Sequence, residues 1–499
     1  MKLSSKILIG AGICLVGPAL FFGGYAAWTR QEVQITRRQL RADGFKIYLS
    51  EFKASFAPEA IARGEAVLSA DIGTGSVLQT DIRAPVYMAA NTFRMETTNS
   101  VVVPWQEEFY SGPKKRSPWP AVRQTLEKHR LEVGAATAAL MDGPIAFRQV
   151  EGREEKRPWS DQFPFAAKTF GVSVLCNLYY GERADAWTNL LALTRMVTQC
   201  ELEPINHRQR TYFQLVPMAY VATWAALQDH GWSDQQLAAL NAEWSRVNFF
   251  DQLPASVAYD RAIHGPVFED LRRPKHNEDG VTLRELLKEP KYIPRVLKED
   301  VHMAWYRWAR SYDDEHDLLL FFRDRELDLR RAIEAPTLLA MLPLPSVTNS
   351  PIFISRYGPN SPVRTSSEFY FFQSRGDKVV GSLGFAIDAE IRRRILLTTI
   401  ALERFKLRTG AYPKQLRELT NVEPKIVLDF VDGQPLRYRQ TSGGEFLLYS
   451  IGLDCVDDGG NGLGFGTNGI ARSIRSGIPK NFDIIWPLPA HFPKPELKE

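Results

Sequence analysis

The chain has 499 residues, which is more than a single hydrophobic core normally holds, so two or three domains are expected. Hydrophobic residues make up 44% of it and charged residues 24%, a composition typical of folded rather than disordered proteins. The net charge is +4, from 62 basic and 58 acidic side chains. This near-balance argues against nucleic acid as the main partner, because a nucleic-acid-binding domain normally carries a strongly basic face.

An apolar run from Ile7 to Trp28 follows two lysines near the N-terminus. About 20 apolar residues suffice to cross a bilayer as a helix, whereas the apolar core of a cleavable signal peptide has about 7–15. We therefore expect residues 1–29 to form an uncleaved signal-anchor with one transmembrane helix. Tyr25 would then lie at the membrane interface. The tripeptide Gly24–Ala26 suits a cleavage site, so removal of the segment remains the alternative.

The orientation of this predicted span rests on two opposing signals. Four arginines follow the run, so the positive-inside rule alone would not export the rest of the chain. A first hydrophobic helix at the extreme N-terminus, however, usually acts as an export signal. We predict a single span with the body outside the cytoplasm.

Residues 30–385 show mainly helical periodicity, which predicts a helical body. Apolar residues recur at helical spacing over 187–197 and 212–224. Ser233 and Gln236 form a capping-box pattern at the start of another helix. Short links between amphipathic helices predict a bundle or helical array. Further helices are expected at 283–289, 295–310 and 316–334.

Several stretches of this body do not follow the helical pattern. Prolines indicate an exposed loop within 97–120 and a longer junction within 343–382, so a domain boundary is expected near 385. The acidic run 313–317 and the basic run 392–394 are each typical of a solvated face. Cys176 lies in an apolar run, which predicts a buried and unreactive thiol.

Residues 386–499 predict a small α+β module. A helix is expected from Asp388 to Thr409, because Gly410 suits a left-handed cap and a proline follows three residues later. Beyond the turn signal Asp432-Gly433, two β-type runs at 436–439 and 446–450 are separated by Ser442-Gly443-Gly444. One helix packed on a small antiparallel sheet is therefore expected.

An acidic, glycine-rich loop begins after the second run. Close carboxylates repel one another unless a cation neutralises them, and Ca²⁺ takes six to eight oxygen ligands in flexible loops. The composition also suits a solvated surface loop without an ion. The carboxylates concerned are Asp454, Asp457 and Asp458.

The stretch 395–489 resembles the globular domain of type II secretion major pseudopilins. The resemblance rests on the Tyr-Pro after the first helix, on Tyr449-Ser450-x-Gly452-x-Asp454, on the acidic loop and on Asp483-Ile484. In that family this order of motifs surrounds a calcium ion. The resemblance implies that Ca²⁺ is bound here by Asp454, Asp457, Asp458 and Asp483.

The whole chain resembles uncharacterised membrane-anchored bacterial envelope proteins with a helical body. That resemblance implies a single-pass protein of the bacterial inner membrane with its body in the periplasm. The N-terminal helix would be its membrane contact, and its protein partner is not specified. The long segment between the first helix and the module argues against incorporation into a secretion filament.

Two functions from different classes remain open. The sequence carries none of the zinc-protease, serine-hydrolase or P-loop motifs, and Gly464–Gly469 matches a dinucleotide motif without the βαβ context it needs. We therefore predict a non-enzymatic, membrane-anchored envelope protein without catalytic residues. The alternative is an envelope hydrolase with Asp260, His264 and Glu269 in a groove of the helical body. A pocket lined by two or more of these residues would favour the enzyme.

Overall fold

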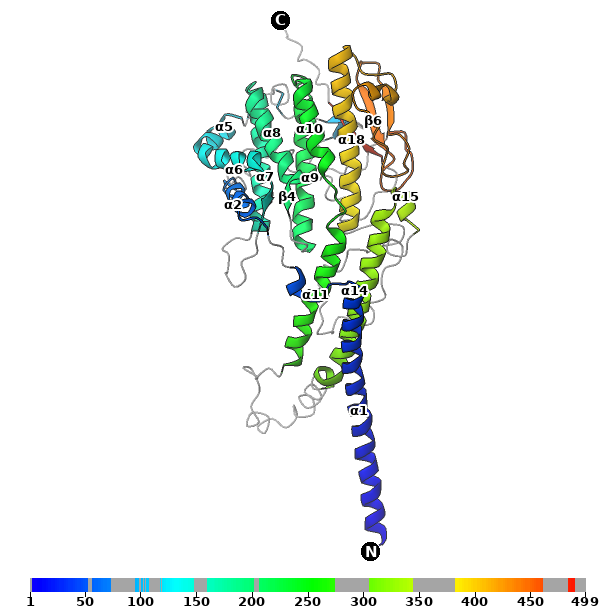
Figure 1. The fold of residues 1–499 in the computed structure, drawn as a ribbon. Helices are drawn as coiled ribbons and strands as arrows, with labels where there is room; N and C mark the ends of the chain where they lie inside the picture. Colours follow the sequence, from blue (N-terminus) through cyan, green and yellow to red (C-terminus); the bar gives the residue numbers. More distant parts are fainter. Residues whose placement is uncertain are drawn as a thin grey trace. The chain divides into compact units, whose positions relative to one another are not determined.

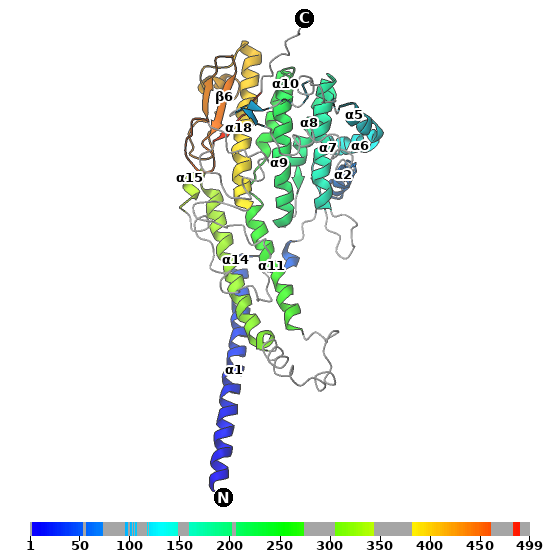
Figure 2. The same cartoon turned by 180° about the vertical axis from the view of Figure 1, so that it is seen from behind.

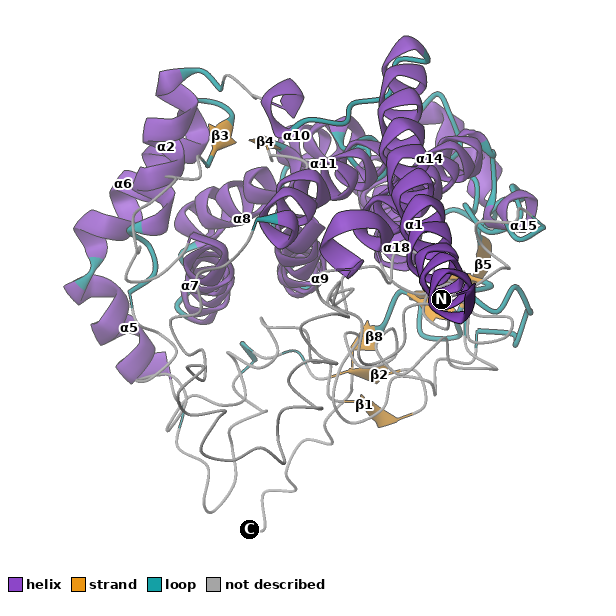
Figure 3. Ribbon diagram, turned by 90° about the horizontal axis from the view of Figure 1, so that it is seen from below, coloured by secondary structure: helices purple, strands orange, loops and turns teal. Residues whose placement is uncertain are grey.

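The computed structural model of the chain is mainly helical, as predicted, and its strands are short (Figure 1, Figure 3). The expected helix at 283–289, residues 295–304 of the next expected helix, the motif at 464–469 and the junction 344–381 lie outside the described residues. The structure describes residues 2–52, 56–72, 95–97, 100–101, 103, 105–106, 117, 119–147, 159–201, 206–273, 305–343, 382–460 and 483–489.

The chain forms two compact units. The first contains Met1–Lys53 and Pro254–Arg330, and the second contains Ala54–Leu253 and Arg331–Glu499. This division runs through the predicted body 30–385 and places residues 386–499 in the second unit. Separate folding of 386–499 stays a prediction.

In the first unit, the long helix α1 (Lys2–Ala42) lies beside the part of α14 (Ser311–Glu334) that belongs to this unit, as Figures 1 and 2 both show. The unit also contains η1 (Leu49–Phe52), most of α11 (Leu253–Arg272) and the π-helical turn η4 (Tyr306–Arg310). Burial of apolar side chains holds these elements together, each contributing about 1.5–3 kcal/mol. The buried cluster consists of Val33, Leu40, Phe45, Ile47 and Leu319.

The N-terminal part of α1 bears on the predicted membrane span. The side chains of residues 1–20 are not among those that the structure describes. In the described part of the chain, no helix combines the length and apolar character needed to cross a membrane.

In the second unit, helices pack side by side with short strands between them. Helix α7 contacts both α8 and α9, and α10 contacts both α8 and α18. Gly64 permits close packing of α2 on β3, since a Cβ there would lie 2.1 Å from the carbonyl oxygen of Ala146. The helices are α2 (Pro58–Leu68), α5 (Trp119–Lys128), α6 (Arg130–Asp142), α7 (Trp159–Tyr179), α8 (Arg183–Thr198), α9 (Asn206–Leu227), α10 (Asp234–Arg246), α15 (Leu338–Met341), α18 (Ser382–Thr409) and the 3-10 helix η6 (Leu416–Asn421).

The local helix predictions agree with the structure, with shifts at the ends. The capping box at Ser233 and Gln236 is present at the start of α10. Helix α14 begins at Ser311, five residues before the expected start at 316. Cys176 is buried, as predicted, and burial raises the pKa of its thiol to about 12.

Helix α18 and a three-stranded sheet occupy the predicted C-terminal region. The helix begins at Ser382, six residues earlier than expected, and ends before Gly410, whose φ of +85° is the expected left-handed cap. The sheet has the order β5-β6-β7 and contacts α18, which Figure 2 shows from behind. Its strands are β5 (Arg437–Gln440), β6 (Phe446–Ser450) and β7 (Ile484–Ile485), all antiparallel.

Two smaller sheets join segments that are far apart in the sequence. In the first, β3 (Ile145–Ala146) pairs in parallel with β4 (Cys200–Glu201). The second has the order β1-β2-β8. Its strands are β1 (Met95–Thr97), β2 (Ser100–Val101) and β8 (Leu488–Pro489).

The basic and acidic runs are not the solvated faces that the sequence predicts. Arg392 is buried and makes a bidentate ion pair with Asp388, at 2.9 and 3.0 Å. Asp314 and Glu315 at the start of α14 are also buried. Each of these buried charges has an opposite charge beside it, because an unpaired buried charge is costly. Asp314 pairs with Arg310, and Glu315 pairs with Arg37 and Arg272.

Candidate functional site

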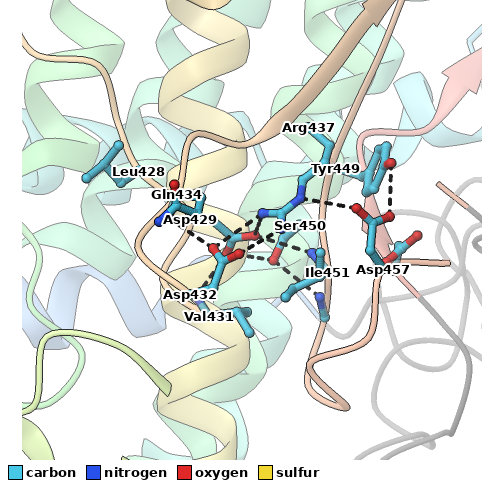
Figure 4. Close-up of polar contacts among 12 residues, drawn as sticks. Leu428, Asp429, Val431, Asp432, Gln434, Arg437, Tyr449, Ser450, Ile451 and Asp457 are labelled. Carbon is cyan, nitrogen blue, oxygen red and sulfur yellow. Dashed lines mark hydrogen bonds and ion pairs between the residues drawn. The ribbon is translucent and has the colours of Figure 1, made fainter. Parts of the chain in front are cut away.

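The predicted metal loop lies between β6 and β7. The structure describes it from Gly452 to Gly460 and again from Asp483, and residues 461–482 lie outside the described residues. The carboxylates around this loop are organised by a sheet residue and by a buried aspartate that precede it in the chain (Figure 4).

Asp429 is the buried aspartate (Figure 4). Its Oδ1 accepts hydrogen bonds from Ser450 Oγ at 2.7 Å and from the N–H of Val431 at 3.0 Å, and its Oδ2 accepts from the N–H of Ile451 at 3.3 Å. Burial raises the pKa of Asp429, while these hydrogen bonds to its charged form oppose the rise. Asp429 thereby ties the turn before β5 to the end of β6.

Arg437 on β5 places a positive charge among three carboxylates (Figure 4). Its guanidinium nitrogens lie 2.7 Å from Asp432, 3.3 Å from Asp429 and 3.4 Å from Asp457. The hydroxyl of Tyr449 donates a hydrogen bond to Asp457 at 3.1 Å. Two side chains of the sheet therefore already contact Asp457, one of the four predicted ligands.

Asp458 and Asp483 meet directly at the base of the loop. Asp483 is buried, and its carboxylate accepts the N–H of Gly460 at 2.7 Å and that of Asp458 at 3.3 Å. Oδ2 of Asp458 is buried and has no hydrogen-bond partner among the residues that the structure describes. Burial raises the pKa of Asp483 to about 6, and the negative charges of Asp457 and Asp458 act in the same direction.

The structure brings the predicted ligand set together only in part. Asp454 Oδ1 accepts the N–H of Val456 at 3.3 Å within its own turn. Within the described ranges, no group of three or more His, Cys, Asp or Glu side chains could hold a metal ion. Binding of calcium by Asp454, Asp457, Asp458 and Asp483 therefore stays a prediction.

Sequence reasoning missed Asp429 and Arg437 as organising residues. One local signal was present, since Asp429 interrupts an apolar run from Ile426 to Val431. A lone carboxylate among apolar neighbours is either exposed or buried with partners. The partners lie further along the chain, so this signal alone does not identify them.

A second candidate site lies within the first unit, in a cavity of about 160 Å³. Two of the three predicted hydrolase residues, His264 and Glu269, line this cavity, and Asp260 does not line it. The other polar residues in its lining are Arg37, Tyr48, Arg261 and Glu315.

His264 has a defined tautomer in its neutral form. Its Nδ1 lies 2.5 Å from the backbone carbonyl oxygen of Asp260, which can only accept a hydrogen bond. Nδ1 therefore carries the hydrogen, and the lone pair is on Nε2. Burial lowers the pKa of His264, which favours this neutral form.

Glu315 is enclosed by two arginines in the wall of the cavity. Arg37 Nε donates to its Oε1 at 2.8 Å, and Arg272 Nη2 lies 2.6 Å from its Oε2. Arg272 also lies over the ring of Tyr312, 3.7 Å from its centroid. The cavity thus combines the imidazole of His264, an exposed carboxylate on Glu269 and the buried Glu315 paired with Arg37.

A comparison of this chain with protein families, with curated proteins and with solved structures finds no match. The resemblance to pseudopilins therefore stays an interpretation of the motifs.

Proposed function

We propose that this chain is a non-enzymatic, single-pass envelope protein of the bacterial inner membrane, with a helical body for protein contact outside the cytoplasm. One observation carries the proposal. Helix α1 contains the apolar run that starts at Ile7, and its later residues Val33 and Leu40 pack into the hydrophobic cluster of the first unit. Because one continuous helix would belong to both the anchor and the body, no flexible hinge would separate them.

The anchor is tested by a charge placed in the apolar run. Leu15→Arg should cost about 2.5–3.5 kcal/mol in membrane insertion, so the full-length variant should leave membranes during an alkaline carbonate wash. Gln34→Arg is the matched control, since Gln34 is exposed on α1 beyond the run. Equal retention of wild type, Leu15→Arg and Gln34→Arg would contradict an anchor at this position.

We also propose that Ca²⁺ stabilises the loop between β6 and β7. The support is that the negative charge around this loop is only partly compensated. The pKa of Asp483 is raised, and the buried Oδ2 of Asp458 has no hydrogen-bond partner among the described residues. Ca²⁺ at about 100 times its Kd would add roughly 2.7 kcal/mol to stability. Chelation should lower the melting temperature of the full chain, and millimolar Ca²⁺ should restore it. Identical melting in both conditions would contradict calcium binding.

The cavity beside His264 and Glu269 favours a second candidate, an envelope hydrolase. Nε2 of His264 would accept a proton from an attacking water, and the arginines would attract an anionic substrate. The test is hydrolysis of nitrophenyl esters and phosphates by the full-length protein. The enzyme is favoured if turnover falls at least tenfold in His264→Gln and in Glu269→Gln. Turnover should stay at the wild-type level in the exposed control Val267→Ala.

A further inference from the structure

Five aromatic side chains gather where α1 passes the π-helical turn η4. The ring of Trp305 lies 4.9 Å from that of Phe22 and 5.6 Å from that of Tyr25, measured between centroids. Trp308 lies 6.2 Å from Trp305, and Trp28 lies 6.0 Å from Tyr25. We refer to Phe22, Tyr25, Trp28, Trp305 and Trp308 as the aromatic patch.

Much of the aromatic patch is exposed. Trp28 is 54% exposed, Phe22 is 45% exposed and Trp308 is 43% exposed, and the neighbouring Phe21 is 71% exposed. Scattered exposed apolar residues are ordinary on a protein surface, but a contiguous group marks an interaction site. Phe21 contacts Phe22, and the rings of Tyr25 and Trp305 connect Phe22 to Trp28 and Trp308. The four exposed side chains therefore belong to one contiguous group, which indicates a surface that a partner or a membrane covers.

Small residues of α1 allow close contact between the two parts of the patch. Ala26 and Thr29 are buried on α1, and Thr29 Oγ1 donates to the carbonyl oxygen of Ala309 at 3.4 Å. A Cβ at Gly23 would lie 3.9 Å from the ring of Trp308. These small residues let η4 and the preceding Trp305 approach α1 closely, so Trp305 and Trp308 lie beside the stretch of α1 between Phe22 and Arg30.

Polar and cationic groups adjoin the patch on its C-terminal side along α1. Arg30 Nη2 donates to the carbonyl oxygen of Trp308 at 3.2 Å, and its guanidinium lies 5.9 Å from the Trp308 ring centroid. Arg310 pairs with Asp313 at 3.1 Å, and the same carboxylate accepts the hydroxyl of Tyr25 at 3.1 Å. Along α1 the chain thus passes from apolar residues to aromatic rings and then to arginines. A bilayer interface favours this order.

The length of α1 places the patch at that interface. At about 1.5 Å of rise per residue, the helix from Ile7 to Trp28 is about 32 Å long, and the hydrocarbon core of a bilayer is about 30 Å thick. If Ile7 lies at one boundary, Trp28 lies at the other. Trp305 contacts Phe22 and Tyr25, and Trp308 lies beside Gly23 and Arg30, so both tryptophans lie within about two helical turns of this second boundary.

We propose that Trp305 and Trp308 insert into the headgroup–acyl boundary of the membrane that α1 crosses, giving the first unit a second attachment to phospholipid. The inference rests on the proposed anchor. Indole rings favour this boundary because their apolar body meets acyl chains while their N–H stays near polar groups. Arg30 and Arg310 would face lipid phosphates.

The experiment uses the full-length protein in nanodiscs of phosphatidylcholine, with bromine at acyl carbons 6 and 7 or at carbons 11 and 12. Bromine quenches tryptophan emission at short range. The emission of one tryptophan is obtained by subtracting the emission of its Trp→Phe variant from that of the wild type. The variants are Trp28→Phe, Trp305→Phe and Trp308→Phe. Trp187→Phe is the matched control, since Trp187 is a partly buried tryptophan of the second unit.

The proposal expects the emission of both Trp305 and Trp308 to be quenched at least twofold more by the shallow bromines than by the deep ones. Quenching of Trp28 without quenching of Trp305 and Trp308 would overturn the second attachment and leave the anchor standing. Absence of quenching for all three would overturn the anchor as well. Circular dichroism of each variant verifies that the helices are retained.

Discussion

Arg261 in the first unit shows how a single buried charge is held. Its Nε donates to the backbone carbonyl oxygen of Lys46 at 2.9 Å, and its Nη1 donates to Glu326 at 2.8 Å. Both side chains are almost fully buried. Buried ion pairs of this kind cost desolvation energy, and removing one partner is strongly destabilising. Without Arg261, Glu326 would keep only its pair with the half-exposed Arg330.

We predict that Arg261→Met destabilises the chain by about 3–5 kcal/mol, because Glu326 loses a buried partner. The double variant Arg261→Met/Glu326→Leu should lose less free energy of unfolding than the two single variants lose together. Chemical denaturation in detergent, followed by circular dichroism, measures these differences. Arg323→Ala, which removes the partly exposed pair with Asp324, should cost less than about 1 kcal/mol. Equal effects of Arg261→Met and Arg323→Ala would contradict the role of burial.

Asp483 makes stability depend on pH. Burial raises its folded-state pKa to about 6, above the unfolded value of about 3.9. The folded state therefore binds the proton more tightly. This contribution is complete below about pH 4 and is lost as the pH rises through about 6.

Asn cannot ionise. We therefore predict that the free energy of unfolding of Asp483→Asn, relative to that of the wild type, rises as the pH increases from about 4 to about 6, when both are measured in chelator. Above that range the difference should become constant. Saturating Ca²⁺ should reduce the gain, because a bound cation would stabilise the charged carboxylate. A difference in stability that does not change with pH would show that Asp483 keeps an ordinary pKa.

At the scale of elements, α9 and the C-terminal sheet share a buried interface within the second unit. Trp224 Nε1 on α9 donates to the backbone carbonyl oxygen of Pro487 at 2.7 Å. The Tyr220 ring lies 5.5 Å from that of Trp486 in an edge-to-face arrangement. Helix α18 contacts α9 as well. These contacts cross the boundary that the sequence places near residue 385.

We predict that Trp224→Phe lowers the free energy of unfolding by about 1–3 kcal/mol, since the buried Pro487 carbonyl loses its donor. Scanning calorimetry of the full chain also tests the boundary. If residues 386–499 unfold together with α9, Trp224→Phe shifts a single shared transition. If they fold separately, a distinct transition stays at the wild-type temperature, as the predicted domain boundary requires.

At the scale of the whole molecule, the proposed topology makes one prediction about access. With one span at 1–29 and the body in the periplasm, protease added to spheroplasts should digest the body. Protease added to inverted membrane vesicles should leave the body intact. A cytoplasmic marker protein verifies that the spheroplasts are sealed. Protection of the body in spheroplasts would reverse the orientation.

The sequence by itself determined the local structure. The helices α8, α9 and α10, the capping box at Ser233 and the cap at Gly410 depend on residues within a few positions of one another. The hairpin of β5 and β6 was predicted to within one residue for the same reason. The predominantly helical fold follows from these periodicities.

Only the tertiary structure decided which charges are buried and which residues share a site. Glu315 is buried because Arg37, 278 positions away in the sequence, pairs with it. Arg392 pairs with its helical neighbour Asp388, but it also lies against the ring of Tyr220, 172 positions away in the sequence, where it is buried. Local sequence does not encode such distant partners. A run of charged residues therefore has the same sequence pattern whether it is solvated or buried in a core. The cavity at His264 and the aromatic patch of α1 and η4 arise in this way.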